Sequence, residues 1–264
     1  MPGEIHKNQT TVMELIDVDI SDLKDPRRVV LERVNWRVER GDYWVVGGLH
    51  ASGKSNLIAT LAGIMPPLSG EYRLFEESLS SQAQLDRFTA RQRLGIVFDG
   101  GRLIHDLTIA ENIALPLRYH GNLRLEEVTS ELEVLLEALG LEPFATSHPA
   151  TVGRNWQQRT GLARALALKP EILLLDNALT GLDPRDAAWW LSFLGTLSSG
   201  HPLMGGKPVT LIGTADDLRP WRDRGSRFAL LKGRQFVVVG SQEELRGYRD
   251  PLLNELLAGY SKPS

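Results

Sequence analysis

GLHASGKS, residues 48–55, is the stretch that decides the fold, because it fits the phosphate-binding loop pattern G-x-x-x-x-G-K-[ST]. In such a loop Gly48 and Gly53 let the backbone turn tightly, so that its N–H groups point at phosphate oxygens. Lys54 reaches the β- and γ-phosphates as a positive charge, and the hydroxyl of Ser55 holds Mg²⁺. The stretch therefore predicts a nucleotide-binding site.

The residues on either side of the loop support this interpretation. Residues 43–46 are typical of a short buried strand, and residues 56–61 continue as a helix whose positive N-terminal end faces the anion. The alternative is a glycine turn before an ordinary helix, and the order strand, loop, helix argues against it. The predicted cofactor-binding residues are Gly48, Leu49, His50, Ala51, Ser52, Gly53, Lys54, Ser55 and Asn56.

The composition excludes several classes of protein. With 264 residues, 42% of them hydrophobic and 24% charged, the chain is typical of an ordinary soluble globular protein with one large domain. A net charge of −3 gives no electrostatic case for binding nucleic acid, and the lack of cysteine rules out disulfides and cysteine-bound metals. No segment resembles a signal peptide or a membrane span, so we expect any membrane role to come through a partner.

Short apolar strands alternate with helices along the chain. Strands are expected at residues 12–20, 29–38, 43–46, 71–75, 94–98, 172–175 and 209–214, with a hairpin at 228–239. Helices are expected at residues 56–61, 126–139, 156–168 and 186–197, with one or two more across 241–260. This alternation predicts an α/β fold with a mainly parallel sheet that is covered on both faces.

A phosphate-binding loop needs a carboxylate to complete the shell around Mg²⁺. The apolar run of residues 172–175 ends in Asp176, which is the Walker B arrangement. The alternative is a buried strand that ends in an aspartate without a role in metal binding. The phosphate-binding loop in the same chain argues against this alternative. Ser55 and Asp176 are therefore the predicted metal ligands.

The order of these segments resembles the nucleotide-binding subunit of ABC transporters, from about residue 12 to about residue 240. Gln158 and Arg159, followed by residues 162–166 (LARAL), are similar to the end of that family's signature helix. Residues 176–183 (DNALTGLD) are similar to Walker B running into the D-loop. Within the family, residues 98–117 and 250–257 look like the ATPases of Mla/Mce lipid transporters.

The resemblance implies a P-loop NTPase (RecA-like) core with a mainly parallel sheet, an antiparallel β part and an inserted helical subdomain. It implies a single ABC ATP-binding domain over residues 10–264. Its parts are the core at about 10–99 and 169–240, the helical subdomain at about 100–168 and a helical tail at about 241–264. The implied cofactors are ATP and Mg²⁺. The implied partners are membrane-spanning permease subunits and either a second copy or another nucleotide-binding subunit, on the cytoplasmic face of the cell membrane.

The departures from the family are concentrated on the hydrolytic groups. Asn177 stands where the family has the glutamate that polarises water, Ala215 where it has a histidine, and Asp99 where it has a glutamine. The signature Leu-Ser-Gly-Gly-Gln is replaced by residues 152–156 (VGRNW), and residues 23–28 offer no aromatic ring where the family stacks adenine. Losing a general base alone typically costs roughly 10²–10⁴ in rate.

These losses, with Lys54, Ser55 and Asp176 retained, predict an ATP-binding subunit of an ABC transporter for lipid that binds MgATP but hydrolyses it poorly. One alternative is a non-hydrolysing pseudo-ATPase with a structural or regulatory role. Another is a competent ATPase that uses Asp99 as a substitute base or Mg²⁺ ligand, although Asp99 also fits a permissive change. Arg154 fits either an exposed residue at a helix start or a contact to a partner's phosphate.

Overall fold

A six-stranded sheet carries the segments that the sequence marks as functional. The computed structural model describes residues 10–75, 77–78, 90–120 and 125–258. The strand order is β10-β9-β3-β8-β7-β6, and every neighbouring pair from β9 to β6 is parallel. The strands are β3 (Tyr43–Gly47), β6 (Leu94–Val97), β7 (Ile172–Leu175), β8 (Thr210–Ala215), β9 (Arg227–Lys232) and β10 (Gln235–Ser241). The carboxyl ends of the parallel strands therefore meet at one edge, where α/β sheets bind ligands.

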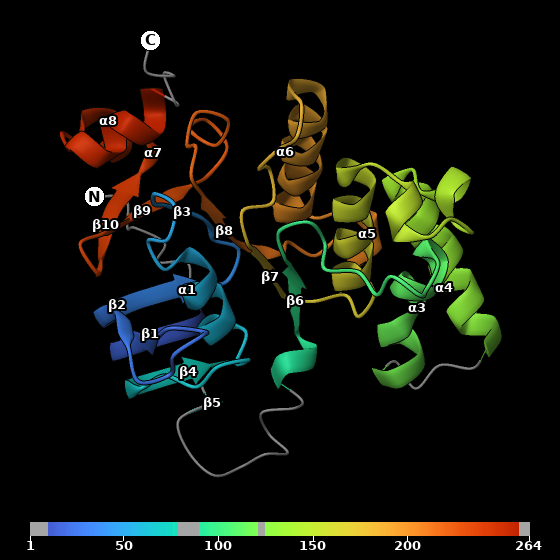
Figure 1. Ribbon diagram of the computed structural model, residues 1–264, viewed down its shortest axis with the longest axis horizontal. Helices are drawn as coiled ribbons and strands as arrows, with labels where there is room; N and C mark the ends of the chain where they lie inside the picture. Colours follow the sequence, from blue (N-terminus) through green and yellow to red (C-terminus); the bar gives the residue numbers. More distant parts are fainter. Residues whose placement is uncertain (1–9, 76, 79–89, 121–124, 259–264) are drawn as a thin grey trace, which may run out of the picture.

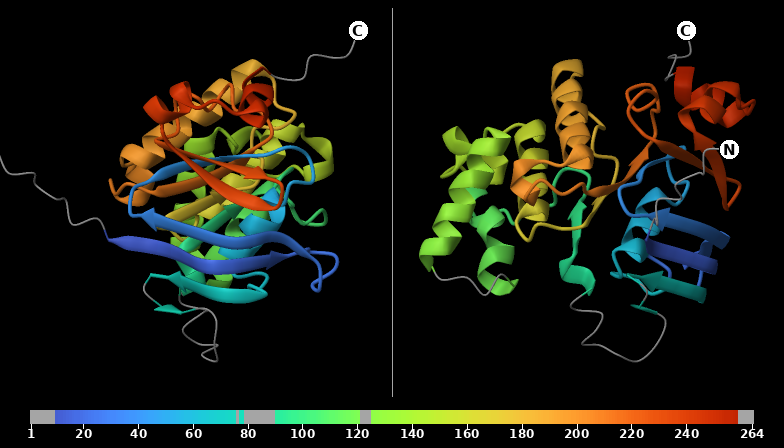
Figure 2. Two further views of the ribbon diagram at one scale, coloured as in Figure 1. Left: turned by 90° about the vertical axis from the view of Figure 1, so that its left-hand side faces the viewer. Right: turned by 180° about the vertical axis from the view of Figure 1, so that it is seen from behind.

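A second, antiparallel sheet lies beside the first, and helix α1 (Lys54–Leu61) packs against it (Figure 1). Its order is β2-β1-β4-β5. The strands are β1 (Thr11–Ser21), β2 (Val29–Glu39), β4 (Ser69–Leu74) and β5 (Glu77–Ser78). The left view of Figure 2 shows these blue and cyan strands below the C-terminal hairpin. The two sheets are joined by an edge-to-face contact of Trp36 and Trp44, whose ring centroids lie 5.3 Å apart.

A lobe of helices lies at one side of the parallel sheet, and the two C-terminal helices lie at the opposite side (Figure 1). The lobe holds α3 (Ile109–His120), α4 (Leu125–Leu139), α5 (Arg154–Leu166) and the short helices η1 (Glu142–Phe144) and η2 (Pro149–Thr151). The remaining helices are α6 (Pro184–Ser199), η3 (Pro202–Met204), α7 (Gln242–Gly247) and α8 (Pro251–Ala258). Among the described residues, none of the helices has both the length and the apolar character needed to cross a membrane.

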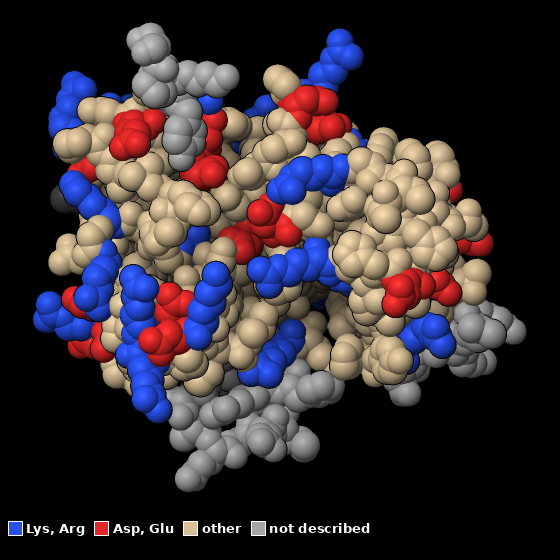
Figure 3. Space-filling model, viewed as in Figure 1, with Lys and Arg blue, Asp and Glu red and all other residues tan. Residues whose placement is uncertain are grey.

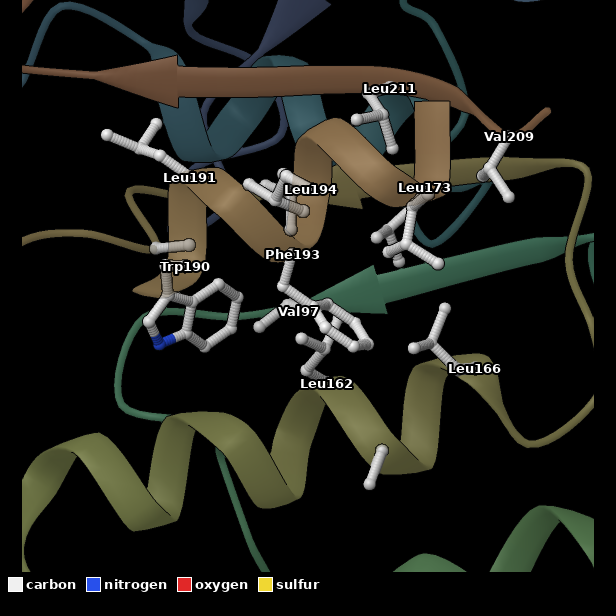
Figure 4. Close-up of a cluster of buried hydrophobic side chains, with 14 of the residues drawn as sticks. Val97, Leu162, Leu166, Leu173, Trp190, Leu191, Phe193, Leu194, Val209 and Leu211 are labelled. Atoms are coloured by element: carbon white, nitrogen blue, oxygen red, sulfur yellow. The ribbon is translucent and has the colours of Figure 1, made fainter. Parts of the chain in front are cut away.

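The apolar core explains why β7 is hydrophobic throughout. All four of its residues are buried, because α5 and α6 cover one face of the sheet and the α1 side covers the other. Figure 4 shows Leu162 of α5 and Trp190 of α6 in one cluster with Leu173 of β7. Burying a side chain of this size stabilises the fold by about 1.5–3 kcal/mol. The predicted α/β class, with a mainly parallel sheet covered on both faces, is confirmed.

The expected strands and helices are present, with ends that shift by one or two residues. Helix α3 was not expected as a separate element, because Pro116 lies inside it and breaks the usual helical pattern. The sequence did contain a start signal. The Thr108 hydroxyl accepts a hydrogen bond from the Glu111 N–H, while the Glu111 carboxylate accepts one from the Thr108 N–H, which is a capping box.

Candidate functional site: a phosphate-binding loop beside two strand ends

The 48–55 loop joins β3 to α1 with a tight curl. Gly53 is the N-cap of α1 and has a φ of 99°, in the left-handed region that favours glycine. A Cβ atom on Gly48 would lie 2.4 Å from Oγ of Ser52 and 3.2 Å from Cβ of Leu231, so glycine leaves room for both side chains. The N–H of Gly48 donates a 3.0 Å hydrogen bond to the carbonyl oxygen of Ala215, which fixes the loop to the end of β8.

Lys54 lies at the centre of the loop, where its side chain is 7% exposed. Its Nζ donates hydrogen bonds to the carbonyl oxygens of Gly48 at 2.6 Å and Leu49 at 2.7 Å. Burial lowers the pKa of Lys54, while the negative charges of Asp216 and Asp176 act to raise it. Within the described residues the ammonium has two carbonyl partners, and a buried cation of this kind is suited to receive an anion such as a nucleoside triphosphate.

Ser55 and Asp176 meet, although 121 residues separate them in sequence. The hydroxyl of Ser55 donates a hydrogen bond to Oδ1 of Asp176 at 3.1 Å, and the hydroxyl of Thr214 approaches the same oxygen at 3.3 Å. Burial is the main cause that raises the pKa of Asp176, and the two hydroxyl groups act against it.

These two residues fit the protein's share of an Mg²⁺ site. Magnesium is usually held by one or two carboxylates together with substrate phosphates, and it keeps several waters. Within the described ranges, no group of three or more metal-ligating side chains occurs that could bind a metal without a nucleotide. The donor set of Ser55 and Asp176 therefore suits a cation that arrives with a triphosphate.

The other predicted loop residues differ in their surroundings. His50 is exposed, as expected for a loop residue that faces solvent, and Ala51 has a left-handed φ of 60°. Oγ of Ser52 is buried and has no hydrogen-bond partner among the described residues, so it is available to a ligand. The side chain of Asn56 donates to the carbonyl oxygen of Ser21 at 3.1 Å and ties α1 to β1.

Asn177 follows Asp176 in a left-handed conformation with a φ of 55°, which asparagine tolerates better than most residues. Its N–H donates to Oγ1 of Thr214 at 3.1 Å, whereas its side-chain Oδ1 is buried without a partner in the described part of the chain. Together with Ala215, Asn177 lines a cavity of about 560 Å³. An amide oxygen in this place can accept a hydrogen bond from water but cannot take up a proton.

Three residues of the 152–156 segment, which aligns with the family's signature, contact other side chains of the same chain. Asn155 is 8% exposed; its Nδ2 donates to Asp186 at 2.7 Å and its Oδ1 accepts from the indole of Trp190 at 3.2 Å. The ring of Trp156 packs on Phe144, with 4.6 Å between centroids. Arg154 forms an ion pair with Asp99, so the carboxylate at the glutamine position faces the start of α5.

Three polar residues at this edge were missed by sequence reasoning. Thr214 bonds both Asp176 and Asn177, and the hydroxyl of Thr180 donates to Asp216 at 3.3 Å. A hydroxyl near the end of the apolar strand β8 was the available signal for Thr214. Nothing local in the sequence marks Thr180 and Asp216 as neighbours.

Comparison with known proteins assigns the family. The family model described as ABC transporter matches residues 31–180, which is more than half of the chain. The chain belongs to the ABC transporter family. The predictions of this family and of its ATP-binding cassette fold are confirmed, and so are ATP and Mg²⁺ as the cofactors of this kind of domain.

Relatives within the ABC transporter family include two methionine import proteins. The methionine import ATP-binding protein MetN of Lacticaseibacillus paracasei is 32% identical over 188 residues, covering 71% of this chain and 53% of the relative. MetN 1 of Pectobacterium atrosepticum is 28% identical over 221 residues, covering 84% of this chain and 63% of the relative. The chain thus spans between half and two thirds of the length of these curated relatives.

Solved ABC cassettes share the fold. The dimeric structure of the ATP-binding cassette MJ0796 bound to ADP and Pi superposes with a TM-score of 0.74 at 28% identity, covering 84% of this chain and 95% of that one. CbiO1 from Clostridium perfringens gives a TM-score of 0.75 at 18% identity, with 90% and 91% coverage, and supports the fold alone.

Proposed function

We propose that this chain is the ATP-binding subunit of an ABC transporter and that it binds MgATP but hydrolyses it slowly. The observation that carries the proposal is a contrast around one site. The binding groups Lys54, Ser55 and Asp176 are gathered at the loop. Asn177 and Ala215 line the neighbouring cavity, and by the resemblance in sequence they stand where the family has its proton acceptor and its imidazole. The groups that bind nucleotide and Mg²⁺ are therefore kept, whereas the groups that would hydrolyse ATP are replaced.

Binding follows from charge and hydrogen bonding. The ammonium of Lys54 exchanges its carbonyl partners for phosphate oxygens, and the loop N–H groups with Oγ of Ser52 supply further donors. Ser55 and Asp176 would hold Mg²⁺, which neutralises phosphate charge when bound. The base and ribose must then lie beyond the loop.

Slow hydrolysis follows from the groups that remain beside the cavity. The amide of Asn177 orients a water but leaves its proton without an acceptor, which raises the barrier by about 3–5 kcal/mol. The methyl group of Ala215 donates no hydrogen bond to a developing phosphate charge. Asp99 is paired with Arg154, which argues against the competent ATPase in which Asp99 serves as the base.

The partners and cargo are part of the proposal. Family membership supports membrane permease subunits and a second nucleotide-binding subunit as partners, and hence a place at the inner face of the membrane. The names of the relatives favour an amino-acid importer over the lipid transporter suggested by the subgroup resemblance. Identifying the permease that co-purifies with the chain tests this assignment.

Calorimetry and a turnover assay on the full chain test the proposal. We expect MgATP binding together with turnover well below the usual range of about 1–10³ s⁻¹. Turnover within that range, for the chain or its purified complex, would establish a competent ATPase. The lack of MgATP binding at about 1 mM ligand would favour the pseudo-ATPase that works as a structural or regulatory subunit.

A further inference from the structure

The central strand of the parallel sheet places a hydroxyl group between the two halves of the site. Strand β8 lies between β3, which leads into the phosphate-binding loop, and β7, which is followed directly by Asp176. Thr214 of β8 pairs with Val46 of β3. On the other side Gly213 pairs with Leu175 of β7. The residues that follow this pair, Thr214 and Asp176, therefore lie at the same level of the sheet, and Thr214 is fully buried there.

The hydroxyl of Thr214 both accepts and donates a hydrogen bond. Its oxygen accepts from the N–H of Asn177 at 3.1 Å. Two acceptors lie within reach of its single proton: Oδ1 of Asp176 is 3.3 Å from the hydroxyl oxygen, and the carbonyl oxygen of Leu175 is 3.4 Å from it. An ionised carboxylate is the stronger acceptor, so the proton is directed toward Asp176. One buried hydroxyl therefore connects the backbone of Asn177 to the carboxylate.

The carboxylate of Asp176 is held by two hydroxyl groups on one of its oxygens. Ser55 donates to Oδ1 at 3.1 Å, and Thr214 approaches the same atom from the sheet. Among the residues that the structure describes, no group donates a hydrogen bond to Oδ2. Two donors on Oδ1 restrict the rotation of the carboxylate and leave its second oxygen to face a ligand.

The two hydroxyl groups differ in their surroundings. Ser55 is exposed near the start of α1 and is itself a predicted metal ligand. Thr214 is fully buried in the sheet, so it acts on a bound cation only through Asp176. Its branched side chain has few rotamers, which limits the directions that its hydroxyl can take. Thr214 is therefore suited to orient the carboxylate and not to bind the ligand itself.

We propose that Thr214 is a positioning residue of the magnesium site: its hydroxyl, fixed by the N–H of Asn177, holds the Asp176 carboxylate in the orientation that MgATP binding needs. The inference rests on the proposed function. Carboxylates that bind metals are themselves hydrogen-bonded, and replacing such a partner typically lowers metal affinity roughly 10–100-fold. Thr214 therefore matters for ATP binding with Mg²⁺ and not for the contacts of Lys54 with the phosphates.

Calorimetric titration of the full chain with ATP, once with Mg²⁺ and once with EDTA, tests the inference. Thr214→Val removes the hydroxyl and keeps a branched side chain in the strand. We expect it to lower the affinity for ATP about tenfold with Mg²⁺, at the lower end of the usual range. The affinity in EDTA should not change, because Nζ of Lys54 bonds the loop carbonyl groups and not Thr214. Thr214→Ser keeps the hydroxyl and should retain most of the affinity with Mg²⁺.

Thr210→Val is the matched control, because Thr210 is a buried threonine at the opposite end of the same strand. Its hydroxyl accepts a hydrogen bond from the N–H of Gly41 at 2.9 Å, so this variant loses a hydrogen bond away from the site. Figure 3 shows acidic side chains near the middle of one face, with basic side chains above and below them, and neither valine variant alters these charges. A difference between the two variants therefore reflects the place of the hydroxyl and not a change in net charge.

Three results overturn the inference. The first is a Thr214→Val variant whose affinity with Mg²⁺ matches that of Thr210→Val. The second is a Thr214→Ser variant that loses as much affinity as Thr214→Val, because the hydroxyl is then not the cause. The third is a wild type whose affinity for ATP is the same with Mg²⁺ and with EDTA. Thr214→Ala replaces Thr214→Val in these comparisons if the valine variant does not fold. A wild type that binds no ATP in either condition overturns the proposed function and this inference with it.

Discussion

The hydroxyl of Ser55 at the start of α1 donates a hydrogen bond to the carboxylate of Asp176 at the end of β7. Ser55 follows strand β3 and its loop, whereas Asp176 directly follows strand β7. In the sheet β8 lies between these two strands. The contact of Ser55 with Asp176 places a hydroxyl and a carboxylate oxygen together before any ligand binds. A cation that binds there meets donors that need little rearrangement, which reduces the cost of binding.

Lys54→Ala should weaken MgATP binding by at least tenfold, or about 1.4 kcal/mol. The reason is that the buried ammonium is the positive charge held within the loop by the carbonyl groups of Gly48 and Leu49. Calorimetry measures the change. Lys169→Ala is the control, because Lys169 is 53% exposed and pairs with Glu131 in the helical lobe. Equal losses in both variants would contradict the assignment of Lys54 to the phosphates.

Asp176→Asn should stabilise the free protein while abolishing the effect of Mg²⁺ on ATP binding. Burial raises the folded-state pKa of Asp176, so between its unfolded and folded pKa values the native state binds more protons and stability falls as pH rises. At neutral pH the folded protein therefore carries the cost of a buried charge, which asparagine removes. Thermal unfolding at pH 7 should show a higher Tm for the variant, and a lower Tm would contradict this.

Mg²⁺-dependent ATP binding should also weaken as pH falls, starting above the ordinary range of an aspartate. Protonation removes the charge that attracts the cation, and the raised pKa of Asp176 brings this loss to higher pH than for an exposed carboxylate. Titrations of ATP between pH 7 and pH 5, with Mg²⁺ and with EDTA, give the contribution of the metal as the difference between the two affinities. A contribution that does not change over this range would argue against Asp176 as the ligand.

Asn177→Glu should raise hydrolysis only partially. The new carboxylate supplies a proton acceptor, but Ala215 still lacks a donor, and the left-handed φ of 55° disfavours glutamate more than asparagine. We expect turnover above the wild type yet still below about 1 s⁻¹. Asn177→Gln, which has the same size without the charge, is the control. Full turnover in Asn177→Glu alone would show that the other replacements do not limit hydrolysis.

The parts of the site that lie close together in sequence were predictable, because the pattern at residues 48–55 fixes both the loop and its flanking strand and helix. The pairing of Ser55 with Asp176 could be predicted because a phosphate-binding loop is expected together with a Walker B carboxylate. The contacts of Arg154 with Asp99 and with the carbonyl oxygen of Thr180 could not be predicted, since they depend on the approach of a helix start and two loops that are distant in sequence. A lone arginine at a helix start has the same local sequence whether it faces solvent or a carboxylate.

MgATP should promote association of this chain with a second copy or with another nucleotide-binding subunit. The MJ0796 cassette, 28% identical to this chain, was solved as a dimer. A nucleotide that contacts both subunits only in the closed dimer shifts the equilibrium toward that state by its differential affinity, without hydrolysis. Under the proposed function, residues 152–156 and Asn177 weaken both halves of such a site, so we expect that simple pairing with an intact partner does not give one normal site.

Light scattering of the chain, alone and with its co-purifying partner, measures this association with and without MgATP. We expect a larger mass with MgATP, slow dissociation after the nucleotide is removed, and no response in Lys54→Ala. If hydrolysis is slow, as we propose, release should follow the nucleotide's affinity or the action of a partner. If the mass and conformation are the same in both conditions, nucleotide does not control assembly. A fixed structural role then explains why the binding groups persist without the hydrolytic ones.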